Sequence, residues 1–435
     1  MVNSIVEQLL EQTRQKVEAA EVYFLSSQDT PIEFENNRLK SLQTKAKQGV
    51  ALRVIHNGKL GFASSTDLTR LDDLIDAAIQ TAEIGDPVDF ELAANYHQSS
   101  PKTSYIPPTT QDLVELGHSL IEKVHNYNSE ILVNVGFHVR TQQVQIATNQ
   151  DVFAEQSSQI ITGSLGGNLV RGEDFLEISS FDIARDRSLD SDRLLSELIE
   201  KYRLAEQKAT ISSGTFPVLF TPRAVAMVLG RLFKTVLSGQ AIVQKSSPLS
   251  DKLGQTLFDP RFTLYEDPKF GPSACEFDDE GTPTTQKTLI DKGTVQGFYW
   301  DRQWAVRGQV EPTGNGFRGG LSRPGPSLVN LCMSPGSTST EDLIASIDEG
   351  LIVDQVLGAG QSNQLAGEFS VNLDLGYKVE NGKIVGRLKN TMVAGNIFEA
   401  FKQLGDLSDR PEWVGGGSNV PSMLFKQLGV AARKS

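Results

Sequence analysis

Hydrophobic residues recur with the period of an α-helix in one stretch of the second half of the chain. At 100° per residue, one face would collect seven apolar side chains: Val225, Val228, Leu229, Leu232, Phe233, Val236 and Leu237. A compact apolar run, residues 218–220, precedes it, and Thr221-Pro222 supplies an N-cap and a first-turn proline. Residues 216–242 therefore predict a short strand, a turn and an amphipathic helix. Between Thr221 and Lys245 there is no histidine, cysteine or carboxylate, so this helix can supply neither a metal ligand nor a general base.

The first hundred residues combine a helical pattern with a strand pattern. An acidic amphipathic helix is predicted at the N-terminus, followed by alternating apolar and polar positions up to about residue 65. Asn57-Gly58 lies between two such runs and predicts a tight hairpin turn. A second helix is predicted over 67–84, which makes this region a β-meander with flanking helices.

Three prolines and many hydroxyl residues between Tyr96 and Thr110 predict a surface linker and a boundary near Pro101. Beyond it the pattern repeats: a helix over Asp112–Tyr127, a series of short strands, and a helix over 188–208 capped by Asp190 or Ser191. The repeated order of helix, strands and helix hints at a weak internal duplication.

The remainder of the chain is rich in strands separated by glycines. Hairpin turns are predicted at 278–282, at 291–293 and at Asn381-Gly382. The chain is therefore expected to be an α+β protein. Its N-terminal α/β regions, with antiparallel strands and flanking helices, occupy residues 1–100 and 101–210, and a large β-rich C-terminal domain occupies 211–435.

The amino-acid composition argues against some classes of function. Acidic residues outnumber basic ones by 54 to 41, which gives a net charge of −13 and argues against direct nucleic-acid binding. No apolar run approaches the ~18 residues of a membrane span, and the N-terminus lacks the pattern of a signal peptide. We expect a cytoplasmic protein without a membrane contact, in which Cys275 and Cys332 are buried free thiols.

Acidic residues and histidines are the first candidates for chemistry. Four carboxylates cluster at Glu276, Asp278, Asp279 and Glu280, but neighbours on a strand and turn point to different sides, so a solvated turn is expected. The five histidines all lie in the first third of the chain without the spacing of a zinc helix, although His118 and His125 could share one helix face. No motif for a nucleophilic serine or cysteine is present.

Three glycine-rich segments, EPTGNGFRGG, GAGQSNQLAG and EWVGGGSNVP, lack the patterns of phosphate and dinucleotide sites. They are expected to be tight turns. The alternative is that they are substrate-facing loops, where glycine would let an extended peptide approach a sheet edge.

Four separated segments resemble the TldD/PmbA family: FDDEGTPTTQKTLIDKG, PTGNGFRGG, GEFSVNLDLGYKVENGKI and MVAGN. The resemblance extends over essentially the whole chain and implies a three-region protein with a C-terminal domain of the TldD/PmbA type. It also implies a role in a heterodimeric cytoplasmic metalloprotease that degrades unfolded peptides and matures modified peptide precursors.

The catalytic TldD branch of that family carries a His-Glu-x-x-x-His zinc motif at the start of the helix after the third region's first strand, and a cysteine near the C-terminus. Here the motif positions fall on Thr221, Pro222 and Ala226, and no cysteine lies around residues 413–419. The resemblance therefore implies the PmbA/TldE branch, with no catalytic or metal-binding residue in this chain, zinc in a TldD-like partner subunit, and unfolded or extended peptides as substrates.

Three alternatives remain open from the sequence. The chain could be a self-standing metallopeptidase that uses the acidic cluster at 278–280 or the histidines. The family's older label also suggests a regulatory binding protein of the gyrase-modulator type. A homodimer in the absence of a catalytic partner is the third.

Overall fold

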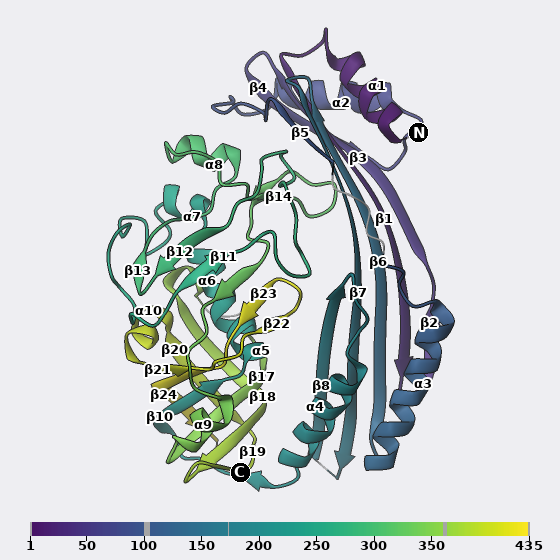
Figure 1. Cartoon of the computed structure of the whole chain (residues 1–435). Helices are drawn as coiled ribbons and strands as arrows, with labels where there is room; N and C mark the ends of the chain where they lie inside the picture. The colour runs from purple at the N-terminus through teal and green to yellow at the C-terminus, as the bar shows by residue number, and fades with distance from the viewer. Residues whose placement is uncertain (1, 100–104, 173, 360–362, 434–435) are drawn as a thin grey trace.

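The computed structural model describes residues 2–99, 105–172, 174–359 and 363–433. A long, curved sheet with flanking helices stands beside a β-rich C-terminal unit (Figure 1). The structure is α+β, as the sequence predicts. None of the helices within the described ranges is long and apolar enough to cross a membrane.

The long sheet contains eight strands, in the order β4-β3-β1-β6-β7-β5, with β2 on β1 and β8 on β7. Their bounds are β1 (Ala19–Glu35), β2 (Arg38–Leu42), β3 (Lys45–His56), β4 (Lys59–Ser65), β5 (Tyr96–Ser99), β6 (Leu132–Thr148), β7 (Val152–Arg171) and β8 (Asp174–Arg185). Strands β1 and β6 pair antiparallel over 14 residue pairs, from Glu21↔Thr148 to Phe34↔Val135. The first two predicted regions thus contribute strands to one sheet.

Two local features of this sheet differ from the sequence-based expectation. Within the predicted linker, Tyr96–Ser99 forms β5, which runs parallel to β7, while residues 100–104, including the predicted boundary at Pro101, lie outside the described residues. The short strands predicted over 131–170 merge into strands of 17 and 20 residues. The Asn57-Gly58 turn is confirmed: both residues have positive φ and His56 pairs with Lys59.

Four helices cover parts of the long sheet. Helices α1 (Val2–Thr13) and α2 (Leu71–Glu83) pack on it at one end. Helices α3 (Thr110–Tyr127) and α4 (Ser191–Leu204) pack on its other half. Asp190 caps α4 by accepting a hydrogen bond from the backbone N–H of Arg193, as predicted.

The C-terminal unit contains two larger sheets and a two-stranded one. The eight-stranded sheet comprises β9 (Lys208–Ala209), β10 (Gly214–Phe220), β17 (Glu349–Leu357), β18 (Glu368–Glu380), β19 (Lys383–Leu388), β20 (Thr391–Asn396), β21 (Leu404–Leu407) and β24 (Met423–Ala432). The six-stranded sheet comprises β11 (Leu264–Glu266), β12 (Lys287–Asp291), β13 (Thr294–Val295), β16 (Leu331–Met333), β22 (Glu412–Val414) and β23 (Ser418–Val420). The third pairs β14 (Gly316–Phe317) with β15 (Gly325–Pro326), and the short helices outside the core stretch are α8 (Arg302–Arg307), α9 (Thr340–Ala345) and α10 (Ile397–Ala400).

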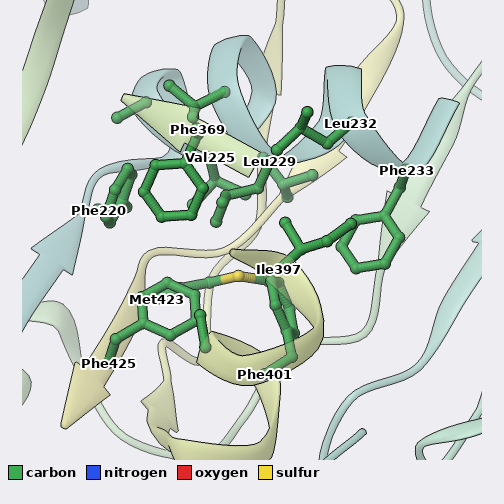
Figure 2. Packing of buried hydrophobic residues seen from close by; sticks show 14 of the residues in the cluster. Phe220, Val225, Leu229, Leu232, Phe233, Phe369, Ile397, Phe401, Met423 and Phe425 are labelled. Atoms are coloured by element: carbon green, nitrogen blue, oxygen red, sulfur yellow. The ribbon is translucent and has the colours of Figure 1, made fainter. Parts of the chain in front are cut away.

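The predicted strand and helix of residues 216–242 lie in the middle of this unit. All seven residues of the predicted apolar face are buried. Strand β10 leads into α5 (Pro222–Ala224), a π-helical segment (Val225–Gly230), α6 (Arg231–Val236) and, after a break, α7 (Gly239–Val243). Figure 2 shows this segment packed against Phe369, Phe401 and Phe425, and the rings of Phe233 and Phe401 lie 5.1 Å apart. The helix is thus correctly placed, although its π-helical segment was not predicted.

A large hydrophobic cluster crosses from the long sheet into the C-terminal unit. It combines residues of α3, α4 and β6–β8 with Leu219, Ile352 and Tyr377 of the C-terminal unit. Burial of shared apolar surface of this kind is a strong, non-directional attraction. The two bodies are therefore joined by a continuous core.

Candidate functional site

The three positions onto which the sequence resemblance places the zinc motif have structural roles here. Thr221 caps α5: its Oγ1 accepts from the backbone N–H of Ala224 at 3.5 Å and donates to Asp354 Oδ1 at 3.0 Å. Pro222 is buried in the first turn, where its missing N–H costs nothing. Ala226 lies in the π-helical segment and packs against the core. None of the three side chains offers a ligand that zinc prefers.

Polar side chains around this helix start connect it to the long sheet. Lys201 of α4 forms an ion pair with Asp354 at 2.9 Å. Arg223 Nη1 donates to the backbone oxygen of Ser179 on β8 at 2.9 Å and to Gln355 Oε1 at 3.0 Å. Along this part of β8, side chains rather than another strand form hydrogen bonds with the backbone.

No group of three or more His, Cys, Asp or Glu within the described ranges is arranged to hold a metal ion. The histidines that the sequence singled out lie apart. His118 packs edge-on against Phe34, while the ring of His125 bonds to the backbone oxygen of Ile131 at 3.2 Å. Both cysteines are free thiols, of which Cys332 is buried and Cys275 half-buried.

The acidic cluster at 276–280 is not a solvated turn, and that prediction is wrong. Asp278 and Glu280 are each 1% exposed. The backbone does form the predicted turn, with a bridge between Phe277 and Pro283, but the turn is pressed against the long sheet. Arginines from distant parts of the chain compensate its charge.

Arg53 on β3 lies between two carboxylates. Its Nη1 donates to Glu280 Oε1 at 2.8 Å, and its Nη2 donates to Glu21 on β1. The second arginine, Arg318, bonds to the other oxygen of Glu21, and its backbone N–H donates to Asp279 Oδ2 at 2.8 Å. We call this group the ionic junction; its members are Glu21, Arg53, Asp278, Asp279, Glu280, Asp301 and Arg318.

The ionic junction contains five carboxylates and two guanidinium groups, and burial there raises the pKa of three of the carboxyl groups. Burial raises the pKa of Asp279 to about 6. Burial, reinforced by the Glu280 carboxylate, raises the pKa of Asp301 to about 7 and that of Asp278 well above its usual value. The junction therefore retains protons at pH values where exposed carboxyl groups have lost them.

The first glycine-rich segment, residues 311–320, is part of the ionic junction. The backbone N–H of Gly316 donates to Asp278 Oδ2 at 2.8 Å, and a Cβ at Gly316 would lie 2.2 Å from Glu280 Oε2. This close approach accounts for the glycine. Of the second segment, residues 360–362 lie outside the described residues.

The third glycine-rich segment borders a cleft of about 500 Å³ between the long sheet and the C-terminal unit. Ile183 and Arg185 of β8 line it from the long sheet, and residues 269–272 and 274–276 together with Trp413 of β22 line it from the C-terminal unit. Strand β22 packs against both β8 and α5, so the cleft adjoins the start of the central helix. We call it the seam cleft.

An interruption in strand pairing contributes to the seam cleft. On the β7 edge away from β6, β5 covers Val152–Glu155 and β8 covers Ile160–Arg171. Residues 156–159 have no strand partner there among the described residues. The Gln156 side chain instead bonds to the loop opposite: its Oε1 accepts from the N–H of Glu276 at 3.0 Å. Unpaired strand edges are places where an extended peptide can add.

Two aromatic rings line the seam cleft. Phe270 is 58% exposed, and its ring lies 5.7 Å from that of Trp413. Gly271 has φ +90°, and a Cβ there would lie 2.2 Å from the Trp413 ring. The glycine therefore lets the indole close over the backbone. The sequence drew attention to the segment of Trp413 but not to residues 156–159 of β7, which lie between the described partner strands β5 and β8.

The proton affinities predict a pH dependence of stability. Asp301 has an ordinary pKa of 3.8 and a folded-state pKa of about 7, so the folded chain holds a proton that the unfolded chain releases. Its stabilising contribution is complete below the unfolded pKa and is lost as pH rises through 7. Asp301→Asn keeps the helix cap, because asparagine also accepts from the N–H of Trp304, but removes the titration.

We expect the free energy of unfolding of the native chain to fall more steeply than that of Asp301→Asn between pH 5 and 8. Urea unfolding at several pH values measures both slopes. The exposed Asp251→Asn variant is the matched control and should follow the native chain. Parallel curves for the native chain and Asp301→Asn would contradict the assignment.

Comparison with known proteins identifies the fold and its family. Residues 213–432 match the PmbA/TldA metallopeptidase C-terminal domain, and residues 20–82 match PmbA/TldA metallopeptidase domain 1. The chain is 24% identical over 431 residues to a metalloprotease TldD homolog of Haemophilus influenzae, covering 92% of this chain and 87% of that protein. It is 25% identical to an uncharacterised protein of Methanocaldococcus jannaschii, covering 93% and 95%. The crystal structure of TldE from Thermococcus kodakarensis superposes with a TM-score of 0.88 at 24% identity, covering 98% of this chain and 100% of that one. The chain belongs to the PmbA/TldD metallopeptidase family.

Proposed function

We propose that this chain is the non-catalytic, PmbA/TldE-like subunit of a cytoplasmic metalloprotease of the TldD/TldE type. One observation supports the proposal: Thr221, Pro222 and Ala226, onto which the sequence resemblance places the zinc motif, are a helix cap, a first-turn proline and a core residue. Zinc does not fit this set of side chains, so no catalytic step is assigned to a metal in this chain.

The proposed partner is a TldD-like subunit that holds the zinc and cleaves the peptide bond. A subunit of the same fold supports this arrangement, because a duplicated chain can keep an interface while its own site is lost. The proposed substrates are unfolded peptides and modified peptide precursors. The contribution of this chain is to complete the substrate chamber and to hold the substrate in an extended form.

The seam cleft supplies the means of holding such a substrate. Residues 156–159 of β7, which have no strand partner on this edge within the described part of the chain, can form backbone hydrogen bonds with an extended chain, and Phe270 and Trp413 can pack against substrate side chains. A folded protein cannot present its backbone in this way because its own strands and helices already use those groups.

The first test compares the isolated chain with the complex from its native cells. A tagged copy should co-purify with a homologue that carries the His-Glu-x-x-x-His motif. Zinc quantification and casein cleavage should give stoichiometric metal and activity in the complex, and neither in the isolated chain, because the isolated chain lacks the ligands.

The matched control is the complex after treatment with a chelator, which should lose cleavage and regain it when zinc is restored. Stoichiometric zinc and cleavage in the isolated chain would refute the proposal and favour a self-standing metallopeptidase. An isolated chain that purifies only as an inactive homodimer, with no catalytic homologue attached, would refute the heterodimer.

The second test concerns the seam cleft. Phe270→Ala removes an exposed ring without opening a core cavity, so we expect the KM of the complex for casein to rise about five- to tenfold with little change in kcat, a loss of binding and not of chemistry. Steady-state kinetics on the complex measures both constants. Leu253→Ala, at a side chain that is 61% exposed and outside the cleft, is the control. An unchanged KM in Phe270→Ala would remove the cleft from the substrate path.

A further inference from the structure

A second pocket, of about 560 Å³, lies on the boundary between the long sheet and the C-terminal unit, which we call the seam. At this pocket the β7–β8 hairpin meets β9, β18 and β19. Among the residues that the structure describes, four cationic side chains and two carboxylates line it. The cations are Arg171, Lys208, Arg387 and Lys389, and the carboxylates are Asp174 and Asp374. The pocket therefore carries a positive excess in a chain whose net charge is −13.

Three of the cations converge on one carboxylate. Arg387 Nη2 donates to Oδ1 and Oδ2 of Asp174 at 2.6 and 2.7 Å. Lys208 Nζ lies 2.9 Å from Asp174 Oδ2, and Lys389 Nζ contacts Oδ1. The fourth cation, Arg171, lies 3.5 Å from Glu130, a carboxylate outside the pocket.

The three neighbouring cations outweigh burial in setting the pKa of Asp174. Partial burial alone acts to raise the pKa of Asp174, but hydrogen bonds from Lys389, Lys208 and Arg387 hold it well below its usual value. One carboxylate does not neutralise three cations, so a second anion would be attracted by the same groups.

The cations differ in how they can receive a ligand. Arg387 is 3% exposed and is fixed in place by its bidentate contact with Asp174. The side chains of Lys208 and Lys389 are 59% and 38% exposed, so their ammonium groups are open to solvent. A ligand can thus reach two partly exposed ammonium groups beside one buried guanidinium, a combination suited to an oxyanion.

We propose that this pocket is a binding site for a small oxyanion, a carboxylate or phosphate group, which bridges the two bodies of the chain. Asp174 belongs to the long sheet, whereas Arg387 and Lys389 belong to the C-terminal unit. A bound oxyanion shares the two lysines with Asp174 and strengthens the seam. Phe175, 56% exposed at the rim, offers an apolar contact to an organic carboxylate.

Binding is measured on the full chain by calorimetric titration with inorganic phosphate at pH 7.5, against sodium chloride of the same ionic strength. We expect saturable phosphate binding that raises Tm, and an at least fivefold weaker affinity in the double variant Lys208→Gln/Lys389→Gln. Lys402→Gln, an exposed lysine paired with Glu399 far from the pocket, is the matched control and should bind as the native chain does.

Asp174→Asn separates a ligand site from a purely structural ion pair. Without phosphate this variant should have a lower Tm, because three cations lose their partner. Its phosphate affinity should nevertheless rise several-fold, because the internal competitor is gone. A purely structural cluster would lower Tm without any gain in affinity, and that result would overturn the proposal, as would equal affinities in the native chain and the double lysine variant.

A matched pair of short peptides ending in phenylalanine, one with a free carboxylate and one amidated, distinguishes the two sources of the oxyanion. Tighter binding of the free-carboxylate peptide, displaced by phosphate, assigns the site to an organic carboxylate. Phosphate binding without binding of either peptide assigns it to a free inorganic anion. No saturable binding of phosphate or of the free-carboxylate peptide would refute the site and leave the proposed role as a protease subunit untouched.

Discussion

The Arg53 guanidinium, buried between Glu21 and Glu280, is the contact on which the arrangement of the two bodies depends. Glu21 and Arg53 come from neighbouring strands of the long sheet, whereas Glu280 comes from a turn of the C-terminal unit 227 residues away from Arg53. The same turn leads directly from residues 274–276, which face β7 across the seam cleft. The ionic junction therefore fixes one wall of the cleft against the other.

Different interactions join the two bodies at different points along the seam. At one end, the ionic junction has more carboxylates than guanidinium groups and retains protons. At the other end, the pocket around Asp174 has more cations than carboxylates. Between them the shared apolar cluster supplies attraction that requires no particular direction. Buried charges contribute little net stability once desolvation is counted, but a misplaced partner is costly, so the two charged ends fix the relative position of the two bodies.

Local features were the ones that the sequence could predict. Hairpins at Asn57-Gly58 and Asn381-Gly382 require positive φ at adjacent residues, and asparagine and glycine meet that requirement without help from distant contacts. The apolar face of residues 225–237 could be predicted because the helical spacing of its apolar residues is also a local property of the sequence. Long-range features were not predicted: the turn at 278–280 is buried only because Arg53 and Arg318 come from elsewhere, and residues 156–159 of β7 lie between the described partner strands β5 and β8, which come from distant parts of the chain. That Thr221, Pro222 and Ala226 carry no zinc ligand follows from their residue types, whereas their roles as cap and core residues required the structure.

Hydrogen exchange of Arg53→Met compared with the native chain tests most directly whether the ionic junction holds the two bodies in place. Removing the guanidinium leaves Glu21 and Glu280 buried without this partner, at a cost of about 3–5 kcal/mol. We predict faster amide exchange in residues 277–282 and 314–318 and along the loop facing β7, with the phenylalanine core around Phe401 unchanged. Arg70→Met, which removes an exposed ion pair with Asp73, should leave exchange as it is in the native chain. Unchanged protection of 277–282 in Arg53→Met would contradict the account, because the turn would then be held in place without its buried arginine.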